Sequence, residues 1–134
     1  MPNQPARLKI LIVDDERDLV DPLVLRLEVD GRFLVETAYD GRDGLRKALS
    51  NPPDAALIDL DLPGIDGWEL CRRLHEHTST RRTRVVLMTA WEGRDLTRRA
   101  TMAGVFGILL KPFEESAMVD ALAGPSAPKK EMSE

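Results

Sequence analysis

The sequence predicts an α/β fold in which helices cover both faces of a parallel five-stranded sheet. Five short apolar runs alternate along the chain with five stretches whose apolar residues have helical spacing. Four of the runs lack polar alternation, which is typical of strands buried on both faces of a sheet, whereas Phe33–Ala38 alternates more, as an outer strand does. An alternating strand–helix order favours parallel strands joined by right-handed crossovers.

Abrupt changes in composition close the strand-like runs. The first run ends in Asp14-Asp15, and the last runs into Lys111-Pro112. Changes of this kind mark strand ends. We expect strands at Leu8–Val13, Phe33–Ala38, Ala55–Leu60, Arg84–Thr89 and Phe106–Leu110.

The stretches between the strands carry apolar residues three or four positions apart, as helices packed on a sheet do. Gly31, Gly104 and Gly124 end three of these stretches. The five apolar stripes are Leu19, Val20, Leu23, Val24 and Leu27; Leu45, Ala48 and Leu49; Trp68, Cys71 and Leu74; Leu96, Ala100 and Ala103; and Met118, Val119 and Leu122.

Length and composition predict one domain over residues 8–123, after an extension at 1–7 and before a disordered tail or linker remnant at 124–134. The net charge of -4 gives no general attraction to nucleic acid, and the arginines lack interleaved aromatic residues. A single cysteine, Cys71, excludes an internal disulfide and fits a reducing compartment. No run approaches the length of a membrane span, so we expect a cytoplasmic protein that binds no membrane.

Four of the five expected strands deliver a chemically reactive or charged side chain at their carboxyl ends. In an open α/β sheet, ligands bind beyond this edge. The residues concerned are far apart in sequence, yet the fold would bring them into one small pocket. They are Asp14 and Asp15, Asp59, Thr89 and Lys111.

Carboxylates gathered a few ångströms apart repel one another unless a cation lies between them. Oxygen ligands favour Mg²⁺, with Mn²⁺ as the alternative, over zinc. A carboxylate can act as a nucleophile and form an aspartyl phosphate. Lys111 and Thr89 would supply a positive charge and a hydroxyl to the phosphoryl oxygens.

The motifs Asp14-Asp15, Asp59-Leu-Asp-Leu-Pro-Gly, Thr89-Ala90 and Lys111-Pro112-Phe113 together resemble the receiver domain of two-component response regulators. The resemblance covers the chain from about residue 8 to residue 123. It implies a flavodoxin-like (βα)₅ fold with strand order 2-1-3-4-5. It also implies a signalling switch rather than a turnover enzyme.

The resemblance assigns a role to each motif residue. Asp59 matches the phosphoacceptor, and a Lys111–Pro112 peptide bond in the cis state would be expected. Thr89 and Lys111 match the residues that bind the phosphoryl group. The metal ligands implied are Asp15 directly, Asp14 largely through water, Asp59, and the backbone carbonyl of Asp61.

The resemblance further implies a sensor histidine kinase or a histidine phosphotransfer protein as phosphate donor. Phosphorylation of Asp59 would shift the conformation of the surface formed by the fourth helix, fifth strand and fifth helix, through which we expect docking or homodimerisation. The downstream partner is not specified by the sequence.

Three positions depart from the family pattern or tune it. Ile108 occupies the place of the usual aromatic switch residue, which puts the threonine–aromatic coupling in question. Trp91 and Asp61 lie two residues after the threonine and the phosphoacceptor, where they would flank the attacking water. We therefore expect Trp91 to shield the aspartyl phosphate and lengthen its lifetime.

Two alternatives remain at this stage. Asp59-Leu60-Asp61 matches the Asp-x-Asp pair of haloacid dehalogenase-type phosphohydrolases, although that family has the pair on its first strand. The second alternative is a degenerate receiver that binds partners without phosphorylation, which Ile108 keeps open. His75 and His77 are interpreted as solvated side chains rather than as a phosphohistidine or metal site.

Overall fold

Five parallel strands form one sheet in the order β2-β1-β3-β4-β5, as the resemblance to receiver domains implied. The computed structural model describes residues 6–90, 93 and 95–124. Parallel pairing joins β3 to both β1 and β4, so β3 lies at the centre of the sheet, and β2 and β5 form its edges. The strands are β1 (Leu8–Val13), β2 (Phe33–Ala38), β3 (Ala55–Asp59), β4 (Arg84–Thr89) and β5 (Gly107–Leu110).

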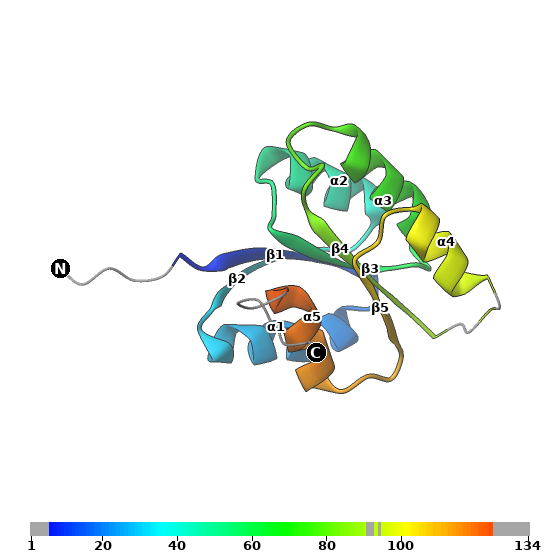
Figure 1. The fold of residues 1–134 in the computed structure, drawn as a ribbon. Helices are drawn as coiled ribbons and strands as arrows, with labels where there is room; N and C mark the ends of the chain where they lie inside the picture. Colours follow the sequence, from blue (N-terminus) through cyan, green and yellow to red (C-terminus); the bar gives the residue numbers. More distant parts are fainter. Residues whose placement is uncertain (1–5, 91–92, 94, 125–134) are drawn as a thin grey trace, which may run out of the picture.

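The helices form a layer on each face of the sheet. Figure 1 shows α1 and α5 on one face and α2, α3 and α4 on the other. This arrangement is the one that right-handed crossovers produce in a doubly wound sheet. The helices are α1 (Arg17–Asp30), α2 (Gly41–Ser50), α3 (Gly67–Glu76), α4 (Leu96–Met102) and α5 (Glu115–Ala123).

Two separate apolar clusters hold these layers to the sheet. Alternate residues of each central strand point to opposite faces. Leu11 and Val13 of β1 therefore enter the cluster under α2, α3 and α4, whereas Ile10 and Ile12 enter the cluster under α1 and α5. All four side chains are at most 2% exposed. The inner strands β1, β3 and β4 are thus buried on both faces, which explains why they consist of nearly continuous apolar runs.

Local sequence signals set three of the helix ends. Asp40 and Asp66 accept hydrogen bonds from the backbone N–H groups of Asp43 and Glu69 and so cap α2 and α3. Gly31 follows α1 with a φ of 86°, a left-handed conformation that glycine adopts without steric cost.

The expected boundaries differ from the observed ones by one residue at two strands. Strand β3 ends at Asp59 rather than Leu60, because the chain turns there toward α3. Strand β5 begins at Gly107 rather than Phe106. Leu19, in the apolar stripe expected for α1, is 46% exposed because it lies at the rim of a surface hollow.

Among the residues that the structure describes, none of the helices combines the length and apolarity that crossing a membrane requires.

Candidate phosphoryl-transfer site

The carboxyl ends of β1, β3 and β5 bring Asp14, Asp59 and Lys111 together. Asp14 follows β1 directly, and its backbone N–H donates to the carbonyl of Ala38 at the end of β2. Asp59 is the last residue of β3. Lys111 follows β5, and its backbone N–H donates to the carbonyl of Thr89 over 2.8 Å. Residues that lie 97 positions apart in sequence thereby come into contact.

Lys111 forms the centre of the charged cluster. Its Nζ lies 3.0 Å from Asp59 Oδ2 and 3.3 Å from Asp14 Oδ2. The Asp14 side chain is 1% exposed and that of Asp59 is 7% exposed, so little water reaches either carboxylate. A charged hydrogen bond of this kind is strong, and it offsets part of the cost of burying two acids.

Backbone groups fix the other oxygen of each acid. The N–H of Asp61 donates to Asp59 Oδ1, and the N–H of Glu16 donates to Asp14 Oδ1, both over 2.9 Å. These turns orient the carboxylates before any ligand arrives. The Asp61 side chain itself is exposed.

The pKa values of Asp14 and Lys111 are both raised, but for different physical reasons. Burial raises the pKa of Asp14 above its ordinary value, and the nearby charge of Asp59 adds to this effect, against the hydrogen bond from the Glu16 N–H. Burial alone would lower the pKa of Lys111, but its hydrogen bond to Asp59 and the two carboxylate charges raise it overall. Lys111 is therefore a permanent positive charge at neutral pH.

The acids form a group that could hold a metal ion. Asp14, Asp15 and Asp59 each offer a carboxylate oxygen, and these oxygens lie within 4.8 Å of one another. Asp15 is exposed, while the other two are buried. An all-oxygen set that is open to water on one side fits Mg²⁺ or Mn²⁺.

A close backbone contact supports the loop that carries the phosphoacceptor candidate. Gly67, the first residue of α3, packs so tightly that an added Cβ would lie 2.6 Å from the carbonyl oxygen of Asp59. Its N–H donates to the carbonyl of Leu60 over 3.1 Å. Helix α3 therefore begins directly against the end of β3. The Lys111–Pro112 bond on the other side of the site is cis, as expected.

The structure brings together most of the residues singled out from the sequence. Thr89 ends β4 and is 1% exposed. Ile108 lies in β5, one strand over, and packs against the cluster under α2, α3 and α4. Trp91 lies outside the described residues.

Sequence reasoning missed two features of this edge. Glu16 Oε1 lies 3.9 Å from Lys111 Nζ, and its position directly after the aspartate pair was the available signal. A mainly apolar hollow of about 430 Å³ also opens beside the site. Its walls come from α1 and from the segment after β5. These two segments are far apart in sequence, so no local pattern predicts that they meet. The walls include Leu19, Pro22, Leu23, Lys111, Pro112 and Phe113.

A family model for the response regulator receiver domain matches residues 10–123. The chain belongs to the response regulator receiver domain family. This family membership confirms the resemblance and places the domain in two-component phosphorylation signalling. It also removes the phosphohydrolase alternative, whose Asp-x-Asp pair belongs on a first strand, whereas Asp59 ends β3.

Curated relatives support the assignment of this receiver domain. The chain is 38% identical over 106 residues to the response regulator ArlR of Staphylococcus saprophyticus, covering 79% of this chain and 46% of that protein. It is 36% identical over 107 residues to the response regulator PleD of Caulobacter vibrioides, covering 80% of this chain and 23% of that protein. The chain therefore spans less than half the length of these relatives.

Solved structures agree with the receiver fold. A response regulator from Chloroflexus aurantiacus has a TM-score of 0.79 and 34% identity, with 87% of this chain and 98% of that chain covered. The chemotaxis response regulator CheY4 of Vibrio cholerae has a TM-score of 0.80 and 26% identity, with 88% and 98% covered.

Proposed function

We propose that the receiver domain accepts a phosphoryl group on Asp59 and acts as a Mg²⁺-dependent switch. The observation that carries this proposal is the Asp59 carboxylate at the end of β3, bonded to Lys111 and lying beside Asp14 and Asp15. A nucleophilic carboxylate needs a cation to accept a dianionic phosphoryl group, and this edge offers both a lysine and a metal-binding set.

The metal would be held by Asp14, Asp15 and Asp59, with the backbone carbonyl of Asp61 as a further ligand. The buried acids, with their oxygens within 4.8 Å of one another, support this assignment. When bound, Mg²⁺ supplies positive charge that neutralises and orients the phosphoryl group.

The side chains of the chain would carry the remaining steps. An Asp59 oxygen attacks phosphorus as the bond from phosphorus to the donor nitrogen or oxygen breaks, and the electron pair leaves with the donor. Lys111 already lies 3.0 Å from Asp59, so it can follow the phosphoryl oxygens without a large movement. Thr89, buried at the end of the adjacent strand, would bind another phosphoryl oxygen.

The phosphate donor would be a sensor histidine kinase or a histidine phosphotransfer protein. The hollow of about 430 Å³ beside Lys111 supports this proposal, because its apolar wall adjoins the reacting group. Leu19, on its rim, is 46% exposed and offers an apolar contact to a donor protein. Small phosphodonors would reach Asp59 without using this contact.

Phosphorylation would shift a population between two conformations of the receiver domain. An energy difference of about 1.4 kcal/mol changes the ratio of two states tenfold. The responding surface would be α4, β5 and α5, through which the domain would dock or form a homodimer. Phe106 and Leu110, beside and within β5, are 48% and 40% exposed and support this choice.

Trp91 and Asp61 would set the lifetime of the aspartyl phosphate. We expect the indole to shield the phosphoryl group from water, so Trp91→Ala should dephosphorylate faster than the wild type. A dephosphorylation rate that does not change in Trp91→Ala would contradict the shielding hypothesis.

The intact mass of the protein tests the central proposal. The protein is incubated with acetyl phosphate or phosphoramidate, with and without Mg²⁺, beside an Asp59→Asn control. We expect a gain of one phosphoryl group that requires Mg²⁺ and is absent from the control. Absence of an adduct when both a small donor and a cognate kinase are supplied would favour the degenerate-receiver alternative.

A further inference from the structure

Positive charge gathers in one part of a chain that is acidic overall. The segment from Gly67 to Gly104 contains eight arginines and four acidic residues, whereas the whole chain has a net charge of -4. This segment comprises α3, β4, α4 and their connecting loops. Helix α3 carries two arginines and two acidic residues, so the excess charge on the two helices comes from Arg98 and Arg99 of α4.

A hollow of about 570 Å³ lies between these two helices, on the side of the molecule away from α1. We call it the α3–α4 groove. Met102, on α4, is 80% exposed, and Trp68, on α3, is partly buried against the core. Trp, Met and Arg are the residues enriched in protein interfaces. The groove is lined by Trp68, Arg72, His75, Glu76, Arg99, Met102 and Ala103.

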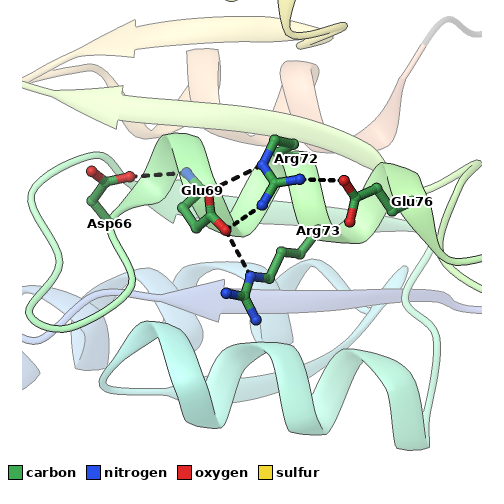
Figure 2. Close-up of polar contacts among 5 residues, drawn as sticks. All are labelled: Asp66, Glu69, Arg72, Arg73 and Glu76. Atoms are coloured by element: carbon green, nitrogen blue, oxygen red, sulfur yellow. Dashed lines mark hydrogen bonds and ion pairs between the residues drawn. The ribbon is translucent and has the colours of Figure 1, made fainter.

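Ion pairs hold the α3 wall of the groove in place. Figure 2 shows Arg72 between Glu69 and Glu76, one helical turn away on either side. Arg73 also pairs with Glu69, over 2.8 Å, and Asp66 caps the start of the helix. A wall whose side chains are already ordered loses less entropy when a partner binds.

The α4 wall carries the positive charge that remains available. The guanidinium of Arg99 lies over the Trp68 ring, 4.5 Å from its centroid, so a cation–π contact joins the two walls. Among the described residues, Arg98 and Arg99 are exposed and form no ion pair, unlike Arg72. A cation stacked on an indole keeps its N–H edge free to bind a carboxylate.

We propose that the α3–α4 groove docks an acidic segment of a protein partner. An apolar side chain of the partner would insert between Trp68 and Met102, and carboxylates beside it would bind Arg98 and Arg99. Among the described residues, the lining of the groove includes none of the acids of the phosphoacceptor edge, and it adds α3 to the α4 side of the α4–β5–α5 surface. It is therefore an interaction surface that the unphosphorylated protein already presents.

A protein segment fits the groove better than a nucleic acid does. The floor is apolar, and within the described residues the aromatic rings that line it are those of Trp68 and His75. Single-stranded nucleic acid needs a series of stacking rings and a track of cations.

Selection from a phage library of short random peptides against the unphosphorylated full chain tests this proposal. We expect enriched peptides to combine several Asp or Glu residues with a large apolar residue. Synthetic copies should bind saturably in fluorescence anisotropy, and affinity should fall about tenfold or more in Met102→Glu and in Arg99→Glu. Both side chains are exposed, so these variants should fold normally, which circular dichroism would verify.

Phe106→Ala provides a matched control, because Phe106 is also exposed but lies beside β5, outside the groove. Its affinity for the peptides should equal that of the wild type. Enrichment of basic or uncharged peptides, no saturable binding, or binding that the groove variants leave unchanged would overturn the proposal. Tight binding of a fluorescent single-stranded oligonucleotide that Arg99→Glu abolishes would overturn it in favour of a nucleic-acid site.

Discussion

The phosphoacceptor edge and the outer face of α3 both contain networks of charged residues, but the two networks differ in exposure. The side chains of Asp14 and Asp59 are 1% and 7% exposed. On α3, Arg72 and Glu76 are 55% and 56% exposed. Water screens the network on α3, so its ion pairs order side chains without adding much stability. The buried network is held at a cost in stability, which a functional site can require.

The pKa values reflect the same difference. Burial raises the pKa of Asp14, so its charged form is disfavoured in the fold. Hydrogen bonds from Arg72, and then from Arg73, lower the pKa of Glu69 to about 2, so its charged form is favoured. The carboxyl groups of Asp14 and Glu69 therefore have pKa values shifted in opposite directions, because Asp14 is removed from water and Glu69 is not.

The largest expected effect comes from the glycine that joins the two regions. Gly67→Ala would place a methyl group 2.6 Å from the carbonyl of Asp59 and 2.7 Å from the Cα of Leu60. Neither backbone atom can move cheaply, so we expect a loss of about 3 kcal/mol in the free energy of unfolding. Urea denaturation measures it. Gly107→Ala, where no atom lies within 4 Å of the added Cβ, is the control and should lose much less.

Removal of the central lysine should have the next largest effect. Lys111→Met leaves the buried Asp14 and Asp59 without their cation, and we expect a loss of about 2 kcal/mol in metal-free buffer at pH 7. Mg²⁺ should restore part of this loss. Lys9→Met, at an exposed lysine, should change little. Equal stability of Lys111→Met and the wild type without metal would show that the acids do not need this charge.

Neutralising Asp14 should act in the opposite direction. Asp14→Asn keeps an acceptor for the Glu16 N–H and removes a buried charge, so we expect a gain of about 1 kcal/mol in metal-free buffer at pH 7. Mg²⁺ affinity, measured by calorimetry, should fall about tenfold or more. A destabilised variant with unchanged Mg²⁺ affinity would contradict both expectations.

The stability gained by Asp14→Asn should depend on pH. Because the folded pKa of Asp14 lies above 3.8, the folded state holds this proton more tightly than the unfolded chain. The resulting stabilisation is present below pH 3.8 and is lost as the pH rises through the folded pKa. The advantage of Asp14→Asn should therefore be greatest at neutral pH and shrink in acid.

The smallest effect is expected on α3. Glu69→Gln removes an acid whose partners are exposed, so its melting temperature should stay close to that of the wild type. The lowered pKa means that any contribution of Glu69 is present above pH 4.5 and is lost as the pH falls through about 2. An NMR titration of the Glu69 carboxyl would measure this pKa directly. A midpoint near 4.5 would show that the pairs with Arg72 and Arg73 do not persist in solution.

The sequence pattern allowed the parallel sheet and most of the site to be predicted, whereas the strand order came from the resemblance to receiver domains. Carboxyl ends of parallel strands meet at one edge, so the sequence alone placed Asp14, Asp59 and Lys111 together. The turns that aim the carboxylates could not be predicted, because they depend on backbone hydrogen bonds such as that from Asp61 N–H to Asp59.

Contacts between helices were harder to predict than contacts at strand ends. The stack of Arg99 on Trp68 depends on how far apart α3 and α4 lie, which no local period specifies. The exposure of Leu19 could not be predicted for the same reason. Helical spacing shows which face of α1 packs on the sheet, but not how far the neighbouring segment covers that face. Relations between elements far apart in the chain are set by packing rather than by local pattern.

The sheet separates two apolar clusters that share no side chain. Substitutions in Leu70 on one side and Met118 on the other should therefore have additive effects on stability, since neither side chain can relax into the space left by the other. Evolution can for the same reason remodel the layer of α2, α3 and α4, including what it recognises, while the layer of α1 and α5 stays unchanged. A receiver built in this way can acquire new associates without rebuilding its whole interior.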